Sequence, residues 1–196
     1  MVEKTQSAGR VGGYGGSPDH TASQERPWLA VTSMAAGRVG PVTPLTTQSS
    51  SPWVAEIAEA VREIDPEILI NVHIVPWRRD DFDGALQRVA GQDPAALSKI
   101  ADFLSPMAYS FMLRRPPEWV ASVVEDLGWV ADCPILPSIQ VSPAYREGEV
   151  FSAGDFEAAL LSALEPPSAG VIFWSWDHIE ADAEKSGVIR KIVQGH

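Results

Sequence analysis

The sequence has little of several features that would place it in a special class of protein. It has one cysteine, Cys133, among 196 residues, so no disulfide can form within the chain. It has no apolar run of about 18 residues, the length that a membrane-spanning helix needs. It carries 15 basic against 26 acidic residues, and its net charge of −11 argues against nucleic acid or an anionic membrane as partner. The N-terminus also lacks the apolar core of a secretory signal, so we expect a cytoplasmic protein.

Patterns typical of metal sites and of catalytic nucleophiles are missing as well. The four histidines are scattered, and a single cysteine cannot complete a zinc site with them. Asp80, Asp81 and Asp83 are close together but do not follow the pattern of a calcium-binding loop. No G-x-S-x-G nucleophile elbow and no glycine-rich dinucleotide turn occurs. We therefore expect neither a metal nor a cofactor.

The first fifty residues differ from the remainder in composition. They are rich in glycine, serine, threonine and proline and show neither a helical nor a strand period. The glycine-rich stretch 12–16 lacks the flanking strand and helix of a phosphate-binding loop. Only Trp28–Thr32 has the composition of a short strand. The sequence thus predicts a low-complexity, disordered segment over 1–50 and a folded domain over 51–196.

From residue 51 onward, apolar strand patterns alternate with amphipathic helix patterns. Strands are expected over 68–75, 103–109, 134–141 and 170–176. Helices are expected over 51–64, 85–90, 95–101, 117–127, 155–164 and 186–193. Strict alternation of this kind predicts an α/β fold with a parallel sheet and right-handed crossovers.

Two architectures accept this alternation, a part of a (β/α)8 TIM barrel and an open doubly wound parallel sheet. Pro106 and Pro137 inside the strand patterns fit strand ends at a barrel rim better than central ladder strands. Polar and aromatic residues gather where the strands end, which is where barrel active sites lie. A complete barrel needs roughly 250 residues. We therefore expect a partial barrel of about four β/α units, its C-terminal half, with the open sheet as the alternative.

The strand ends carry the candidate site residues. Trp174 and Trp176 offer flat apolar faces to sugar rings, and Asp177 offers an acid near a glycosidic oxygen. Gln140, near the end of its strand, is placed to bind a hydroxyl. Trp77 either stacks on a sugar or packs within its loop.

Side chains alternate along a strand, so Asn71, His73, Val75 and Trp77 share one face. This more polar face is expected to point toward the barrel axis. His73 lies in the middle of its strand, where a hydrogen-bonded core histidine is favoured over a catalytic one.

Two of the strand patterns resemble motifs of family 18 glycoside hydrolases. The stretch 105–110, Ser-Pro-Met-Ala-Tyr-Ser, is similar to their sixth-strand motif M-x-Y-D, and 170–177 is similar to their eighth strand. The resemblance implies a glycoside-hydrolase-like TIM barrel in which Met107 and Tyr109 face the site and Trp174 forms its floor. The chain departs from the family at Ser110, where the motif has aspartate, and it has no D-x-x-D-x-D-x-E motif.

Three functions remain open. A glycosidase would use Asp177 and Tyr109 near the chemistry and Trp174 and Trp176 to hold the sugar. A carbohydrate-binding barrel without turnover would use the same aromatic residues. A fragment would fold only when a second copy or another chain completes the barrel, so the sequence predicts self-association or such a partner.

Overall fold

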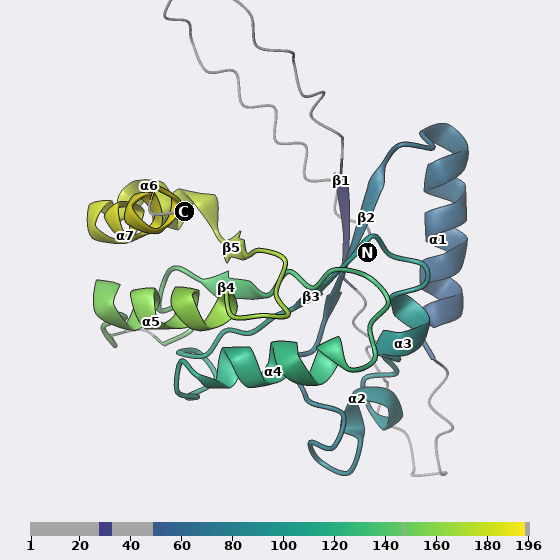
Figure 1. The fold of residues 1–196 in the computed structure, drawn as a ribbon, viewed down its shortest axis with the longest axis horizontal. Helices are drawn as coiled ribbons and strands as arrows, with labels where there is room; N and C mark the ends of the chain where they lie inside the picture. Colours follow the sequence, from purple (N-terminus) through teal and green to yellow (C-terminus); the bar gives the residue numbers. More distant parts are fainter. Residues whose placement is uncertain (1–27, 33–48, 147, 195–196) are drawn as a thin grey trace, which may run out of the picture.

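The computed structural model describes residues 28–32, 49–146 and 148–194, and Figure 1 shows how their elements are arranged. The described residues form strands β1 Trp28–Thr32, β2 Leu69–Ile74, β3 Phe103–Pro106, β4 Ser138–Gln140 and β5 Ile172–Trp174. They also form helices α1 Ser51–Ile64, α2 Ala85–Arg88, α3 Pro94–Leu97, α4 Trp119–Gly128, α5 Ala153–Ala163, α6 Trp176–Ala181 and α7 Ala183–Gln194. No helix in these described ranges is both long and apolar enough to cross a membrane.

All strand pairs are parallel, and the strands lie side by side in chain order. β2 pairs with β1 on one side and β3 on the other, and β4 pairs with β5. Isolated parallel bridges, Leu104 to Ile135 and Met107 to Ser138, join the two sheets. The prediction of an α/β fold with parallel strands is confirmed. Among the described strands the order lacks the reversal that a doubly wound sheet shows at its switch point.

The structure adds one strand to the four that the sequence predicts from residue 51 onward. β1 pairs with β2 along its whole length, from Trp28 opposite Leu69 to Thr32 opposite His73. Ordered structure therefore extends into the segment 1–50, because a short apolar strand is stabilised by a partner far along the chain that no local pattern reveals. The prediction of disorder for 1–27 and 33–48 lies outside the described residues.

Helix α1 shows how its buried stripe follows from the helical period. Pro52 opens the helix, and Val54 and Ala58, four residues apart, are its buried residues. The helical period of the apolar residues Trp53, Ile57, Val61 and Ile64 predicts that they form the buried face, but Trp53 and Ile64 are 67% and 87% exposed. This expectation is wrong by one residue, since a shift of one position rotates the face by about 100°.

The core lies between the strands and the helices that cover one side of them (Figure 1). Ile70, Val72 and Ile74 of β2 pack against a cluster that includes Val54 of α1 and Val123 of α4. Farther along the sheet, Ile139 of β4 belongs to a second cluster with Phe156 and Leu160 of α5. Each such side chain contributes roughly 1.5–3 kcal/mol when fully buried. Because side chains alternate along a strand, the residues between these core residues point to the opposite face of the sheet.

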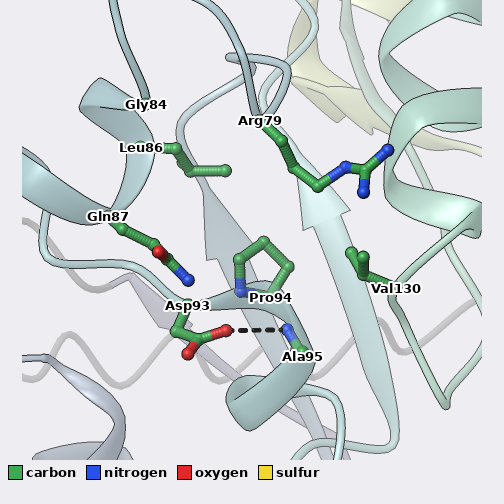
Figure 2. A pocket seen from close by; sticks show the side chains of 8 residues that line it. All are labelled: Arg79, Gly84, Leu86, Gln87, Asp93, Pro94, Ala95 and Val130. Carbon is green, nitrogen blue, oxygen red and sulfur yellow. Dashed lines mark hydrogen bonds between the residues drawn. The ribbon is translucent and has the colours of Figure 1, made fainter.

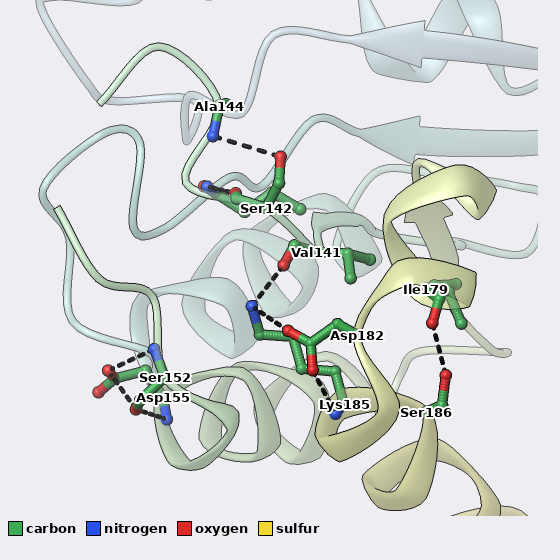
Figure 3. A network of polar contacts seen from close by, with 10 residues as sticks. Val141, Ser142, Ala144, Ser152, Asp155, Ile179, Asp182, Lys185 and Ser186 are labelled. Carbon is green, nitrogen blue, oxygen red and sulfur yellow. Dashed lines mark hydrogen bonds and ion pairs between the residues drawn. The ribbon is translucent and has the colours of Figure 1, made fainter. Parts of the chain in front are cut away.

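The chain after β5 folds differently from the single last helix that the sequence predicts. α6 begins at Trp176, two residues after β5 ends, and α7 follows after Asp182. Lys185 of α7 fixes this pair of helices to the sheet, as Figure 3 shows. Its ammonium donates to the Val141 carbonyl at 2.8 Å, pairs with Asp182 at 3.2 Å and lies 4.7 Å from the centre of the Phe151 ring.

Candidate functional site

A cavity of about 550 Å3 opens at the carboxyl ends of β2, β3 and β5. Its wall comes from the strand ends and from the loops that follow β3 and β4. The lining residues are His73, Val75, Pro76, Met107, Tyr109, Met112, Leu113, Tyr145 and Trp174. This end of a parallel sheet is where α/β folds bind ligands, because loops converge there on a rigid frame.

Two aromatic side chains meet in the wall of the cavity. The rings of Tyr109 and Trp174 are stacked, with centroids 5.0 Å apart and planes inclined by 24°. Trp174 is 37% exposed, so part of the indole stays accessible. The Tyr109 hydroxyl lies 3.4 Å from Ser138 Oγ, and burial raises the pKa of this phenol above its ordinary value. Tyr109 is therefore neutral at pH 7, and its hydroxyl can donate or accept a hydrogen bond.

His73 also lines the cavity. A line of polar contacts runs back from it along one face of the sheet, which holds Ser105, Asn71 and His73 and which we call the concave face. Ser105 Oγ lies 2.7 Å from Asn71 Oδ1, and Asn71 Nδ2 lies 3.5 Å from His73 Nε2. Burial lowers the pKa of His73, so the ring is neutral at pH 7. With Nε2 facing an amide donor, the neutral ring carries its proton on Nδ1. The sequence favours a hydrogen-bonded core histidine at this position. Its alternation with Val75, which also lines the cavity, is the sequence signal that could have placed His73 there.

Met107, Tyr109 and Trp174 are thus brought together in the lining of one cavity. Asp177 and Trp176 are not among the lining residues. Both are exposed in the first turn of α6, and Trp176, 66% exposed, instead borders a hollow with Phe173 and Ile179. The reason is that the strand ends at Trp174, so the alternation of a strand no longer directs the side chains that follow.

Gln140 and Trp77 also lie outside the lining of the cavity. Gln140 is 1% exposed and its amide is used within the chain: Oε1 accepts from the Met112 backbone at 2.7 Å, and Nε2 donates to the Ser142 carbonyl at 2.6 Å. Trp77 makes an edge contact with Phe82, with ring centroids 5.5 Å apart. The structure therefore gives Gln140 a supporting position behind the loops, and it gives Trp77 the loop packing that was its alternative.

The rim of the cavity is held by contacts between the loops after β3 and β4. Arg146 Nη1 donates to the Phe111 carbonyl at 2.6 Å, and its guanidinium lies 4.5 Å from the centre of the Phe111 ring. Glu149 forms an ion pair with the same guanidinium. Tyr145, next to Arg146, is held on the rim in this way. Sequence reasoning missed Tyr145 because no period or motif marks a residue in such a loop.

The described residues of the cavity wall carry no formal charge at pH 7. No carboxylate, lysine or arginine is among them, and His73 is neutral. Throughout the described part of the chain, no group of three His, Cys, Asp or Glu side chains could hold a metal ion. The wall offers a flat apolar surface and a small number of neutral hydrogen-bonding groups.

A second, smaller cavity of about 150 Å3 lies beside α2 and α3, and Figure 2 shows its lining. Its two charged side chains already have partners in the chain. Arg79 pairs with Asp126 at 3.2 Å, and Asp93 accepts from the Ala95 backbone at 3.1 Å as the N-cap of α3. This cavity offers no free charged group of its own, and we assign no ligand to it.

Comparison with known proteins shows a likeness of fold alone. No family model matches the chain, and no curated protein matches its sequence. The structure is similar to bee venom hyaluronidase in complex with a hyaluronic acid tetramer, with a TM-score of 0.50 and 16% identity over 74% of this chain. A monoclinic crystal form of the same enzyme gives a TM-score of 0.42, again at 16% identity. The chain spans about half, 49%, of the hyaluronidase in the complex, and its fold is distantly similar to that glycoside-hydrolase barrel.

Proposed function

We propose that this chain is a carbohydrate-binding protein that holds a saccharide in the cavity at the carboxyl ends of its strands. The observation that carries this proposal is the stacked pair of Trp174 and Tyr109 in the cavity wall. One face of a pyranose ring is lined by C–H groups, and an indole of this kind packs against it. The likeness of fold to a hyaluronidase crystallised with a hyaluronic acid tetramer supports a saccharide as the ligand.

The fold that carries this site is proposed to be part of a (β/α)8 barrel. Parallel strands in chain order, each of β2 to β5 followed by helix, support it, as does the likeness to about half of the hyaluronidase. Within such a barrel, β3 and β5 take the places of the family 18-like sixth and eighth strands. The convergence of Tyr109 and Trp174 on one cavity supports that placement.

Binding without cleavage is the function that the cavity supports best. Glycosidases use a pair of carboxyl groups that flank the scissile bond, about 5–10 Å apart. The described residues of the cavity lining include no such group, and Asp177 stands exposed in α6 outside the cavity. Glycoside hydrolysis, with Asp177 as the acid and Tyr109 beside it, is the second candidate, and the likeness to a hyaluronidase supports it.

The proposal is tested by calorimetric titration of the wild type and of Trp174→Ala with a panel of oligosaccharides. Loss of stacking is expected to weaken binding by about 1–2 kcal/mol, while the variant stays folded because part of the indole is exposed. Trp53→Ala is the matched control, since Trp53 is 67% exposed on α1 and outside the cavity. A thermal melt of both variants accompanies the titration. If Trp174→Ala folds and binds as the wild type does, the proposal is wrong.

A further inference from the structure

From the charges around the cavity we infer that it selects an uncharged saccharide over one that carries carboxylates. The inference rests on the proposed function and narrows its ligand class. It also separates this chain from its structural neighbour, whose bound ligand, hyaluronic acid, has a carboxylate in every disaccharide.

The first support is the lining itself. A carboxylate that enters the cavity gives up part of its hydration and needs a cation or several strong donors in return. Among the nine described residues that line the cavity there is no lysine and no arginine. Its polar side chains are His73, Tyr109 and Tyr145, which suit hydroxyl groups better than a full negative charge.

The second support is that His73 does not supply the missing charge. Burial lowers its pKa, and the neighbouring Asn71 presents an amide to Nε2 rather than a carboxylate that would favour the imidazolium form. The ring therefore stays neutral at pH 7. A neutral imidazole exchanges hydrogen bonds with a sugar hydroxyl without the cost of burying an ion.

The third support is that four of the five described arginines in the loops after β2, β3 and β4 are already paired with carboxylates, while the fifth, Arg115, lies 5.9 Å from the centre of the Trp119 ring. Arg146 is bound to Glu149 and to the Phe111 carbonyl, and Arg114 lies 3.7 Å from the same carboxylate. On the loop after β2, Arg78 is paired with Asp81 at 3.0 Å and Arg79 with Asp126. Recruiting Arg78 or Arg79 to a ligand would leave a carboxylate of the protein without its ion-pair partner, and recruiting Arg146 would break its bond to the Phe111 carbonyl.

The fourth support is the electrostatic field that the net charge of the whole chain produces. The net charge is −11, and the segment 51–196 carries 11 basic and 23 acidic residues, a net of −12. A surface of this sign repels an anionic polymer and slows its approach at low ionic strength. Neutral oligosaccharides are unaffected by that field.

The experiment compares matched pairs of oligosaccharides that differ in charge and share their rings and linkages. One pair is the hyaluronan tetrasaccharide and the same tetrasaccharide with its carboxylates reduced to hydroxymethyl groups. The other pair is a cello-oligosaccharide and its C6-carboxylated form. The full chain is titrated with all four by calorimetry, at low and at high ionic strength. The uncharged member of a pair is expected to bind at least about ten-fold more tightly, because an unpaired carboxylate is costly to desolvate.

A cation placed on the rim tests whether the selection is local. Leu113 lines the cavity and is 42% exposed, so Leu113→Lys adds an ammonium there with little strain. This variant is expected to lower the affinity ratio of the uncharged over the carboxylated member several-fold. Leu161→Lys makes the same change in net charge on α5, where Leu161 is 51% exposed and outside the cavity lining, and is expected to leave the ratio nearly unchanged.

The outcomes separate the two proposals. Equal or tighter binding of a carboxylated member by the wild type overturns the selectivity and leaves carbohydrate binding standing. If Leu113→Lys and Leu161→Lys reduce the affinity ratio between uncharged and carboxylated oligosaccharides equally, the selectivity is not a property of the cavity and the inference is overturned. Absence of binding for all four oligosaccharides overturns the proposed function, and the selectivity with it.

Discussion

At the scale of single residues, His73 links the cavity to the stability of the fold. Burial lowers its pKa below the ordinary value of 6.5. Above pH 6.5 the ring is neutral in both the folded and the unfolded chain and contributes no pH dependence. Below it the unfolded chain binds a proton first, so the free energy of unfolding falls as the pH drops from 6.5 toward the lower pKa of the folded state.

We expect His73→Gln to remove this dependence on pH. Urea unfolding at several pH values between 7 and 5 measures it, as the difference between wild type and variant, which cancels the shared contribution of the carboxylates. The wild type should lose stability faster than the variant as the pH falls. Identical slopes would mean that His73 titrates alike in both states.

Asp177 separates binding from catalysis. Its carboxylate is exposed in the first turn of α6 and does not line the cavity, so Asp177→Asn is expected to bind oligosaccharide as the wild type does. Only a carboxylic acid protonates a departing glycosidic oxygen, so any hydrolysis by the wild type should disappear in this variant if Asp177 is the acid. Release of reducing ends, measured beside the titration, checks both. Weakened binding would contradict the exposed position of Asp177.

At the scale of elements, the fit of α7 to the sheet depends on one buried ammonium. Lys185→Met keeps the length of the side chain but leaves the Val141 carbonyl without its donor. The expected cost is about 1–3 kcal/mol of unfolding free energy, measured by urea denaturation. Lys191→Met is the matched control on the same helix, since Lys191 is 76% exposed and its pair with Glu157 should contribute less than about 1 kcal/mol. Equal effects of the two variants would contradict a special role for Lys185.

The same scale shows which parts of the structure the sequence could predict. Alternation within a strand and the rule for parallel strand ends together predict that Tyr109 and Trp174 converge, because both depend on local pattern. β1 was not foreseen as a paired strand, because its stability comes from β2, far along the chain. Asp177 lies outside the described cavity lining because its direction depends on where β5 gives way to α6, which strand alternation does not predict. Tyr145 depends on loop contacts such as that of Arg146 with Phe111, which no period records.

At the scale of the whole molecule, the concave face and the outer strands are open in the described part of the chain. Within the described residues, β1 pairs only with β2 and β5 only with β4. Leu69, Phe103, Leu136 and Ile172 line an apolar hollow of about 260 Å3 on that face, together with Asn71. Unpaired strand edges beside apolar surface promote association.

We therefore expect the 196-residue chain to associate with itself in a concentration-dependent way. Sedimentation velocity over a range of protein concentrations measures it. Ile172→Lys, which places a charge on the concave face, is expected to weaken the association, whereas the surface change Leu161→Lys is not. A wild-type chain that stays monomeric at every concentration would contradict a partial barrel with an open face.

The contacts that join the loops after β3 and β4 have a consequence for the thermodynamics of recognition. Gln140 and Arg146 fix the backbone of one loop to the other before any ligand arrives. A preorganised rim spares the ligand the entropy of ordering those loops, which otherwise opposes binding by roughly 0.5–1.5 kcal/mol for each flexible side chain that is immobilised. Tyr145, 84% exposed, is the side chain of the rim with the most freedom left to lose. The entropic cost of holding a sugar is thus expected to fall on the exposed side chains of the rim, Tyr145 and Leu113, and not on the loop backbone.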